Sequence, residues 1–271
     1  MRKILLVGCG HMGSALLDAW YKNTSFKFSI IDPKTHSALK KKYNKRVSIY
    51  KSIKEINNVN QFNIIIFAVK PQIVQKVVSQ FSSIDNKKIL FLTIVAGKKI
   101  SFFKKHLAHP HQIIRAMPNM PALVEKGMTC LISNNLTSYK NKMIASNLFR
   151  FVGKIFWLNN ESDIDKVTAV SGSGPAYFFL FIENIISESI KLGLKKKVAE
   201  QLVLQTALGS IDLLLKSKKS AGELKKSIAV KGGTTEAAIN IFENKSMFKK
   251  IINKALSAAY NRSKKLAVTK Q

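Results

Sequence analysis

Two glycine-rich segments in the second half of the chain have the composition of small-anion sites. The first contains Ser171-Gly172-Ser173-Gly174, and the second contains Gly232-Gly233-Thr234-Thr235. Glycine-rich loops that open helices expose backbone N–H groups at the positive end of the helix dipole. We therefore expect each segment to bind a small anion through its main chain.

A third glycine-rich segment, with the pattern Gly8-x-Gly10-x-x-Gly13, lies near the N-terminus between an expected strand and an expected helix. This spacing is typical of dinucleotide-binding folds. The first glycine allows a tight turn, the second lets the backbone approach a pyrophosphate, and the third lets the helix pack closely on the strand. The alternative is a plain tight turn.

Asp32 ends the second expected strand, where a carboxylate can accept from the adenosine ribose hydroxyls of NADH. The alternative role for Asp32 is helix capping. Lys34 and His36 lie close by and could accommodate the 2′-phosphate of NADPH. The sequence therefore leaves the choice between NADPH and NADH open.

Three further strand ends complete the predicted cofactor site. Lys70 could contact a phosphate or a ribose, small residues such as Gly97 let a flat ring approach, and Asn119 offers a polar group in a double-proline loop. The alternatives are an exposed lysine in a turn and a structural proline turn. The predicted cofactor-binding residues are Gly8, Cys9, Gly10, His11, Met12, Gly13, Asp32, Ala68, Val69, Lys70, Pro71, Ala96, Gly97 and Asn119.

These loops need a parallel sheet to position them. Short apolar runs alternate with helical patterns up to about residue 160, which indicates an α/β fold with a Rossmann-type doubly wound sheet. The expected strands are 3–7, 26–31, 47–49, 63–69, 88–95 and 113–117, with edge strands at 128–133 and 154–158. The expected helices between them are 14–22, 37–43, 73–81 and 138–151. Residues 118–121, with two prolines, are expected to be neither helix nor central strand.

The remaining sequence predicts only helices, so we divide the chain into a dinucleotide-binding domain (1–160) and a helical domain (161–271). The expected helices are 176–192, 197–216, 221–229, 234–243 and 248–266, followed by a frayed basic tail from Lys264. Residues 178–182 are apolar nearly all round, which predicts a helix buried on several sides. Such a helix favours a dimer interface.

The net charge of +30 among 271 residues could indicate a nucleic-acid-binding protein. The basic residues, however, are spread along the chain and are nearly all lysine, whereas base readers depend on arginine. The arginines are Arg2, Arg46, Arg115, Arg150 and Arg262. We therefore interpret the charge as solvated surface that could help to steer anionic ligands, and we expect no nucleic-acid partner.

The sequence also indicates the cellular compartment of the protein. The first ten residues mimic a lipoprotein signal, but the apolar run 4–7 is shorter than a signal core, and no apolar run approaches a membrane span. We expect a cytoplasmic protein without a membrane partner. Cys9 and Cys130 do not make a disulfide framework, and no Cys/His cluster has zinc spacing, so no metal is expected.

Taken together, these motifs resemble the Δ1-pyrroline-5-carboxylate reductase family over essentially the whole chain. The segments that carry the resemblance are Gly8–Gly13, Ala68–Pro71, Arg115–Pro121 with Gly127–Thr129, Val170–Tyr177 and Gly232–Thr235, in family order. The resemblance implies reduction of L-1-pyrroline-5-carboxylate to L-proline by NADPH or NADH, without a metal or a covalent intermediate. It also implies a homodimer of interleaved helical domains, commonly assembled to a decamer.

The resemblance also assigns roles in the second half of the chain. Gly232, Gly233 and Thr234 would hold the substrate carboxylate, while Ser171, Gly172, Gly174 and Tyr177 would flank the ring. Thr235 would hydrogen-bond the ring nitrogen and relay a proton, with Ser173 as a second catalytic residue; helix capping is the alternative for both. Where many members have Ser-Pro, this chain has Val230-Lys231, which bears on substrate affinity more than on reaction type.

Two other protein classes fit these motifs less well. A β-hydroxyacid dehydrogenase needs a general-acid lysine on its first C-domain helix, but the helix from Ala176 has no lysine before Lys191. A non-enzymatic basic binding protein would form salt-sensitive complexes with polyanions and would not oxidise NADH. It leaves the glycine loops unexplained. His106, His109 and His111 are expected on a surface loop.

Overall fold

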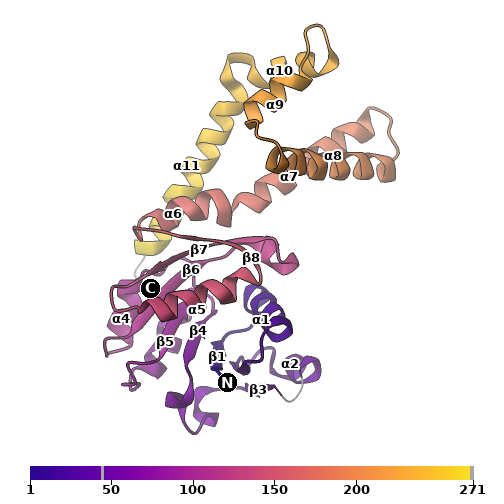
Figure 1. The fold of residues 1–271 in the computed structure, drawn as a ribbon. Helices are drawn as coiled ribbons and strands as arrows, with labels where there is room; N and C mark the ends of the chain where they lie inside the picture. The colour runs from indigo at the N-terminus through magenta and orange to yellow at the C-terminus, as the bar shows by residue number, and fades with distance from the viewer. Residues whose placement is uncertain (44–45, 269–271) are drawn as a thin grey trace. The chain divides into compact units, whose positions relative to one another are not determined.

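The computed structural model describes residues 1–43 and 46–268. The chain forms two compact units: an N-terminal unit of Met1–Gly172 with Ala259–Gln271, and a helical unit of Ser173–Ala258 (Figure 1). The division after Gly172 lies later than the expected domain boundary at residue 160. The last turns of the C-terminal helix belong to the N-terminal unit, where buried Ser263 donates to Asp165 Oδ1 at 2.6 Å.

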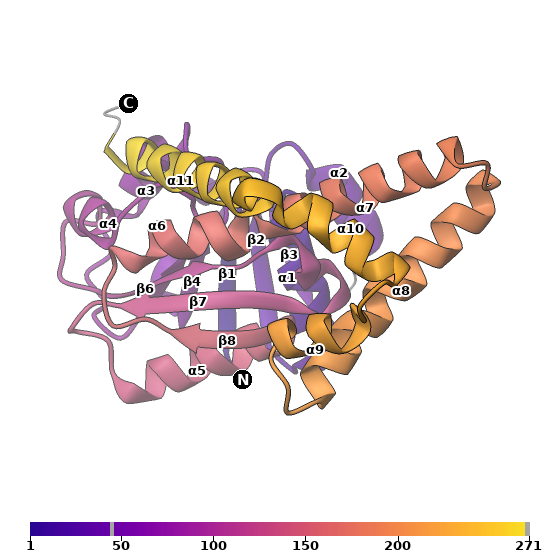
Figure 2. The same ribbon diagram turned by 90° about the horizontal axis from the view of Figure 1, so that it is seen from above.

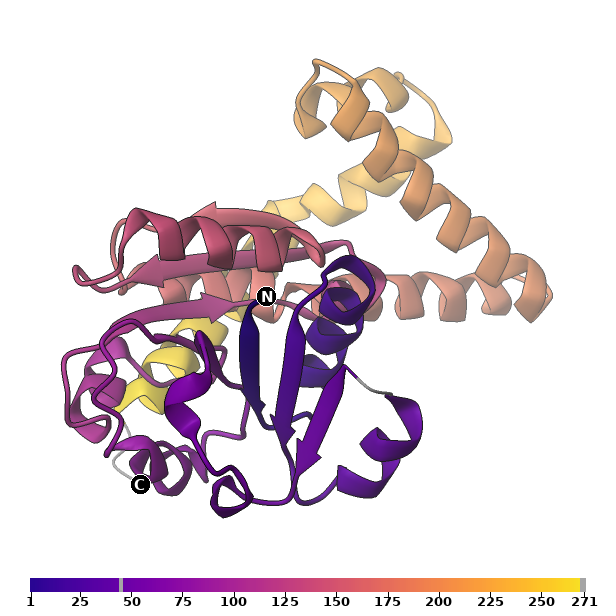
Figure 3. The same cartoon turned by 60° about the horizontal axis from the view of Figure 1, so that its bottom comes forward.

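The N-terminal unit is built on one eight-stranded sheet with strand order β3-β2-β1-β4-β5-β6-β7-β8. Neighbouring strands are parallel except for the antiparallel pair β6–β7. The strands are β1 (Lys3–Val7), β2 (Lys27–Ile31), β3 (Val47–Tyr50), β4 (Ile64–Phe67), β5 (Leu90–Thr93), β6 (Gln112–Met117), β7 (Gly127–Ser133) and β8 (Gly153–Trp157). The predicted doubly wound fold is thus confirmed. Figure 3 shows β1, β2 and β3 running side by side.

Helices cover both faces of this sheet. The α-helices of this unit are α1 (His11–Asn23), α2 (His36–Lys42), α3 (Val74–Val78), α4 (Ile100–His106), α5 (Tyr139–Arg150) and α6 (Asp163–Val167). The 3-10 helices are η1 (Ile53–Glu55), η2 (Val59–Gln61), η3 (Ser79–Phe81) and η4 (Met120–Val124), and η5 (Thr168–Gly172) is a π-helix. The alternation of side chains along each strand feeds two apolar layers. In β1, Ile4 and Leu6 enter one buried cluster, while Leu5 and Val7 enter the other.

Several expectations for this unit are wrong. Strand β7, expected at an edge of the sheet, lies between β6 and β8. Residues 118–121 were expected to exclude helix, but η4 begins at Met120 with Pro121 in its first turn, where the missing N–H costs nothing. His106 ends α4 instead of lying in a loop. His111 is buried, not on the surface: its ring packs on Phe91 at 4.7 Å between centroids, and its Nε2 lies 2.9 Å from the Ile84 carbonyl.

The helical unit contains the long helices of the C-terminal half. They are α7 (Gly174–Lys191), α8 (Lys196–Lys216), α9 (Ala221–Ile228), α10 (Thr234–Glu243), the 3-10 helix η6 (Asn244–Ser246) and α11 (Met247–Val268), which continues into the N-terminal unit. The tail expected to fray from Lys264 is therefore helical up to Val268. Figure 2 shows α7 and α8 meeting at their connecting turn and spreading apart from it. Gly193, in that turn, has φ +101°.

Little of this unit is buried. Among its described residues only Gly174, Ala199 and Val203 are buried. Phe178, expected on a helix buried on several sides, is 64% exposed in the single chain. Contrary to the expectation that no segment has the length of a membrane span, α8 is long and apolar enough to cross a membrane by length and composition alone.

Candidate active site

The Gly8–Gly13 loop joins β1 to α1, and two of its glycines are required by packing within the chain. Gly8 has φ +92°, and a Cβ there would lie 2.7 Å from the Ala68 carbonyl oxygen. A Cβ on Gly13 would lie 2.8 Å from the Gly8 carbonyl oxygen. Gly10 differs, because an added Cβ would meet nothing within 4 Å and its φ is negative. The open space beside Gly10 is what a ligand approaching the backbone requires.

The same loop provides the N-terminus of α1. Gly10 is the N-cap residue, its backbone is extended, and no side chain caps the first amides of the helix. Uncapped amides at the positive end of a helix attract phosphate. Gly8, Gly10 and the amides of His11 and Met12 therefore fit the pyrophosphate of a dinucleotide.

Asp32 is hydrogen-bonded to this loop and is nearly buried, with 9% of its surface exposed. Its Oδ2 accepts from the Cys9 amide at 2.7 Å, and its Oδ1 accepts from the amides of Lys34 and Thr35 at 2.9 and 3.0 Å. Burial raises the pKa of the Cys9 thiol to about 12, and the charge of Asp32 adds to that rise. Cys9 is thus a protonated, packed side chain.

The neighbouring strand ends lie along the same edge. Ala68 and Val69 contact Gly8, and the exposed Lys70 follows them. A hollow of about 350 Å³ adjoins this turn and is lined by Pro71, Gln72, Val74, Gln75, Lys76, Ser79 and Lys98. The sheet therefore brings the loops after β1, β2 and β4 together.

Packing within the chain explains why residue 97, after β5, is a glycine. Its φ is +69°, and a Cβ there would lie 3.2 Å from Leu266 Cβ, near the end of α11. The small side chains at Ala96 and Gly97 were predicted to admit a flat ring. That role stays a prediction, whereas the close approach of Leu266 already accounts for a glycine at this position.

Asn119 is engaged in structural hydrogen bonds. Its Nδ2 donates to the carbonyl oxygen and to the hydroxyl of Ser171 at 3.1 and 3.3 Å, and its Oδ1 accepts from the Met128 amide at 2.8 Å. The side chain thereby fastens η4 to β7 and to η5. A cofactor contact of Asn119 stays a prediction.

The segment around Ser171–Gly174 is not the loop that its glycines suggested. η5 continues α6, and Ser173 joins η5 to α7 with helical dihedral angles and no side-chain cap. Gly172 allows a close approach of Met117, whose Cε would lie 2.8 Å from an added Cβ. The main chain of residues 168–174 is therefore helical instead of forming the expected open loop. Ser173 does not cap α7 by a hydrogen bond.

The Gly232–Thr235 segment does open a helix, but half of its amides are in use. The Gly232 amide donates to Glu236 Oε2 at 2.8 Å, and the Gly233 amide donates to the Val230 carbonyl at 3.0 Å. Thr234 and Thr235 occupy the first turn of α10, where the helix supplies no acceptor for the amides. Gly233, not Thr235, is the N-cap residue, so the capping alternative for Thr235 is wrong.

The predicted substrate residues are divided between the units. Ser171 and Gly172 lie in the N-terminal unit, whereas Ser173, Gly174, Tyr177 and Gly232–Thr235 lie in the helical unit. Within the helical unit the principal packing pairs α7 with α8 and α10 with η6. The predicted cofactor residues lie in the glycine loop and in the loops that follow strands of one sheet.

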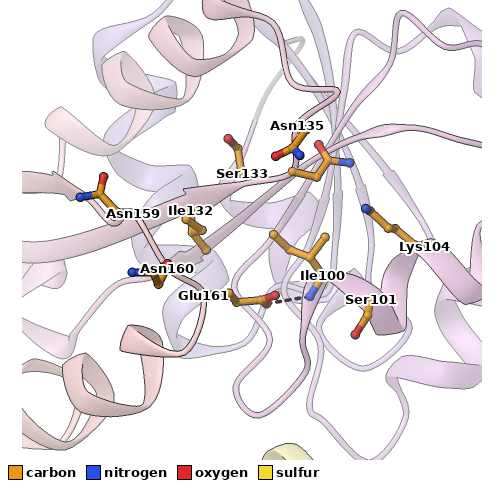
Figure 4. A pocket seen from close by; sticks show the side chains of 10 residues that line it. Ile100, Ser101, Lys104, Ile132, Ser133, Asn135, Asn159, Asn160 and Glu161 are labelled. Carbon is orange, nitrogen blue, oxygen red and sulfur yellow. Dashed lines mark hydrogen bonds between the residues drawn. The ribbon is translucent and has the colours of Figure 1, made fainter.

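Sequence reasoning missed one polar cavity of about 330 Å³ (Figure 4). Glu161 lies on its wall, where Oε1 accepts from the Ile100 amide at 2.7 Å and from Arg115 Nη1 at 2.9 Å. Arg115 is buried in β6, so the Glu161 carboxylate, through its two bonds, ties the start of α4 to β6. The cavity contains none of the predicted site residues. Within residues 1–43 and 46–268, no group of three or more His, Cys, Asp or Glu side chains could hold a metal ion.

Comparison with known proteins places these features in a family. Residues 161–266 match the model described as pyrroline-5-carboxylate reductase dimerisation, and residues 3–97 match the model described as NADP oxidoreductase coenzyme F420-dependent. Pyrroline-5-carboxylate reductases of Pseudomonas aeruginosa and Escherichia coli are each 33% identical; the matches cover 98% of this chain and 97% and 98% of theirs.

Solved structures give the same result. The Plasmodium falciparum pyrroline carboxylate reductase with NADP bound is 31% identical with a TM-score of 0.84, and the match covers 98% of both chains. The Coxiella burnetii pyrroline-5-carboxylate reductase is 31% identical with a TM-score of 0.87, again over 98% of both chains. The similarity spans both units.

Proposed function

The chain belongs to the pyrroline-5-carboxylate reductase family, and on that premise we propose that it reduces L-1-pyrroline-5-carboxylate to L-proline, the last step of proline biosynthesis. NADPH or NADH supplies the hydride. The observation that carries the proposal is the extent of the match, which covers 98% of the chain instead of the dinucleotide loop alone. The open backbone at Gly10 supports a bound dinucleotide in this chain.

The substrate is a cyclic imine with one carboxylate, so the site has to hold an anion and a ring nitrogen. The amides of Thr234 and Thr235 at the start of α10 are the free donors for the carboxylate. Gly232 and Gly233 shape that turn, because Gly232 has φ +77°. Most of the rate comes from holding the imine carbon against the reduced nicotinamide.

The hydroxyl of the half-buried Thr235 is the group proposed to hydrogen-bond the ring nitrogen, which gains a proton as the carbon gains the hydride. Ser173 is proposed as a second polar group at the ring. Ser171, Gly172, Gly174 and Tyr177 are proposed to flank it from η5 and α7.

The chain carries its family's dimerisation domain, and it acts as an oligomer on a small molecule. We propose the homodimer as the basic unit, assembled further to a decamer, and a cytoplasmic location. The exposed apolar side chains of α7 and α8 support this assembly, since a helix apolar on several sides needs a covering partner. The same covering accounts for the apolar length of α8 without a membrane.

The proposed reaction is tested by following the absorbance of NADPH and of NADH, separately, with the purified protein and pyrroline-5-carboxylate. We expect oxidation of at least one nucleotide, dependent on the imine, with proline as the product. Failure to oxidise either nucleotide would contradict the proposal.

The role of Thr235 is tested by Thr235→Ala, with Thr234→Ala as the matched control one residue earlier in α10. Loss of a general acid lowers turnover by about 10²-fold, while binding of the nucleotide stays unchanged. The Thr234→Ala control keeps the backbone amide and should lose less turnover. A near-normal rate for Thr235→Ala would exclude this hydroxyl as the proton donor.

A further inference from the structure

The polar cavity of about 330 Å³ in the N-terminal unit is formed by three separate segments (Figure 4). Helix α4 supplies Ile100, Ser101 and Lys104, the end of β7 and the turn after it supply residues 132–135, and the segment after β8 supplies residues 159–161. The volume lies at the lower end of the range for small-molecule sites, roughly 300–1,000 Å³. The cavity therefore suits a small ligand.

Glu161 brings a fixed carboxylate to the wall of this cavity. Its Oε1 accepts from the Ile100 amide at 2.7 Å and from Arg115 Nη1 at 2.9 Å, whereas no described residue donates to Oε2. The Glu161 side chain is 26% exposed, while that of Arg115 is only 5% exposed. Because two hydrogen bonds to one oxygen hold the carboxylate in place, the other oxygen is a preorganised acceptor for a cation.

Lys104 brings the opposite charge to the same cavity. Figure 4 shows its side chain extending from α4 toward the turn that contains Asn135. Within residues 1–43 and 46–268, the Lys104 ammonium makes no hydrogen bond and no ion pair, and this includes Glu161. A lysine and a glutamate that line one cavity without pairing leave both charges available to a ligand placed between them.

Most of the remaining lining consists of neutral hydroxyl and carboxamide groups. Those whose side chains form no hydrogen bond with another described residue are Ser101, Ser133, Asn135, Asn159 and Asn160. Such groups donate as well as accept, so they can bind either end of a polar ligand. Only Ile100 and Ile132 in the lining are apolar, so the cavity offers little to a hydrophobic ligand.

We propose that this cavity binds a small zwitterionic α-amino acid, whose ammonium group donates to Glu161 Oε2 and whose carboxylate accepts from the Lys104 ammonium. Such a ligand gains a charge-assisted hydrogen bond at each end. An inorganic anion would bind Lys104 alone and would face the Glu161 carboxylate. The proposal does not rest on the reductase reaction, because the cavity contains none of the residues proposed for that reaction.

The proposal is tested by screening the proteinogenic amino acids for a rise in the melting temperature of the intact, nucleotide-free protein. Calorimetry then measures the affinity of those that raise it. Acetate and methylammonium, which carry one of the two charges each, are the control ligands. We expect at least one amino acid with a small side chain to bind, and each control ligand to bind about tenfold or more weakly.

Lys104→Gln removes the charge proposed to bind the carboxylate, and it should weaken binding of the amino acid about tenfold. Lys105→Gln is the matched control, because Lys105 is the next residue of α4 and does not line the cavity. Its affinity for the amino acid should stay nearly unchanged. Both lysines are exposed, so we expect both variants to fold.

Three results would overturn the proposal: no amino acid binds, a control ligand binds as tightly as the amino acid, or the Lys104→Gln and Lys105→Gln proteins bind the amino acid equally well. The third result covers an amino acid held at the proposed reductase site, because Lys104 is not part of that site. Nucleotide oxidation is measured in a separate assay, so the failure of this proposal is distinguishable from the failure of the proposed reaction.

Discussion

The two units of this chain differ in where their apolar side chains lie. The N-terminal unit buries two clusters, one on each face of its sheet. In one of them Phe67 stacks on Phe91 and Phe103 and meets Phe81 edge-on. Only three of the described residues of the helical unit are buried, and even large apolar side chains such as Phe179 and Leu208 are more than half exposed. One unit buries its apolar side chains within the chain, and the other leaves them exposed in the single chain, as the proposed dimer requires.

The largest expected effect is on the helical unit. Leu208→Asp places a charge on the apolar side of α8, and a two-fold interface would meet it twice. Losing one leucine at about 1.5–3 kcal/mol per subunit, or about 3–6 kcal/mol per dimer, raises the dimer dissociation constant by about 10²- to 10⁴-fold. Light scattering after gel filtration measures this, and the turnover falls with it.

Leu136→Asp is the control, because Leu136 and Leu208 are both 53% exposed and Leu136 lies in the N-terminal unit. It should leave the assembly intact. If both variants dissociated equally, or if neither dissociated, the proposed interface on the helical unit would be contradicted.

A smaller effect is expected from replacing one glycine in each unit by alanine. Gly10→Ala meets no atom of the protein, so the melting temperature should stay the same while the dissociation constant for NADPH rises by about tenfold or more. Gly232→Ala forces φ +77° on an alanine and should cost about 1–2 kcal/mol of local stability. A Gly10→Ala protein that binds NADPH normally would contradict the open-backbone argument.

The smallest expected effect is a pH response confined to the N-terminal unit. Burial lowers the pKa of His111 from its ordinary 6.5; the bond to Ile84 opposes this, nearby His109 lowers the pKa further, and Asp85 raises it. Below pH 6.5 the unfolded chain takes up a proton that the folded chain does not, so stability falls as the pH falls, by at most about 1.4 kcal/mol per pH unit.

His111→Gln keeps a donor for the Ile84 carbonyl and removes the titration, so its denaturation midpoint should vary less between neutral and mildly acidic pH. The helical unit has no matching response there. Its shifted acid, Glu223 of the α9 capping box, has a pKa lowered by hydrogen bonds from Ser220, so that contribution is lost only as the pH falls below 4.5. An unchanged pH profile in the variant would exclude His111 as the cause.

The sheet could be predicted because its pattern is local: each strand is a short apolar run that ends at glycine, proline or aspartate. Helix α4 was missed because its cap is not local. The side chain that accepts from the Ile100 amide is Glu161, which lies 61 residues away in the sequence. No pattern around Ile100 records that partner.

Residues of the candidate site also have distant partners that the sequence does not reveal. The glycines around Ser171 predicted a loop, but the segment is a π-helix whose Ser171 carbonyl accepts from Asn119, 52 residues earlier. Asp32 was correctly seen as a polar residue at a strand end. Its engagement by the Cys9, Lys34 and Thr35 amides depends on the fold of the turn, which residue type does not reveal.

The return of α11 to the N-terminal unit has a consequence for how this protein can be cut. The helical unit is an insertion, anchored covalently at both ends, at Gly172–Ser173 and at Ala258–Ala259. Stopping the chain after residue 172 would strip Gly97 of its Leu266 neighbour and leave Asp165 without Ser263. A nucleotide-binding fragment should therefore be made by bridging the two cuts with a short linker, not by truncation.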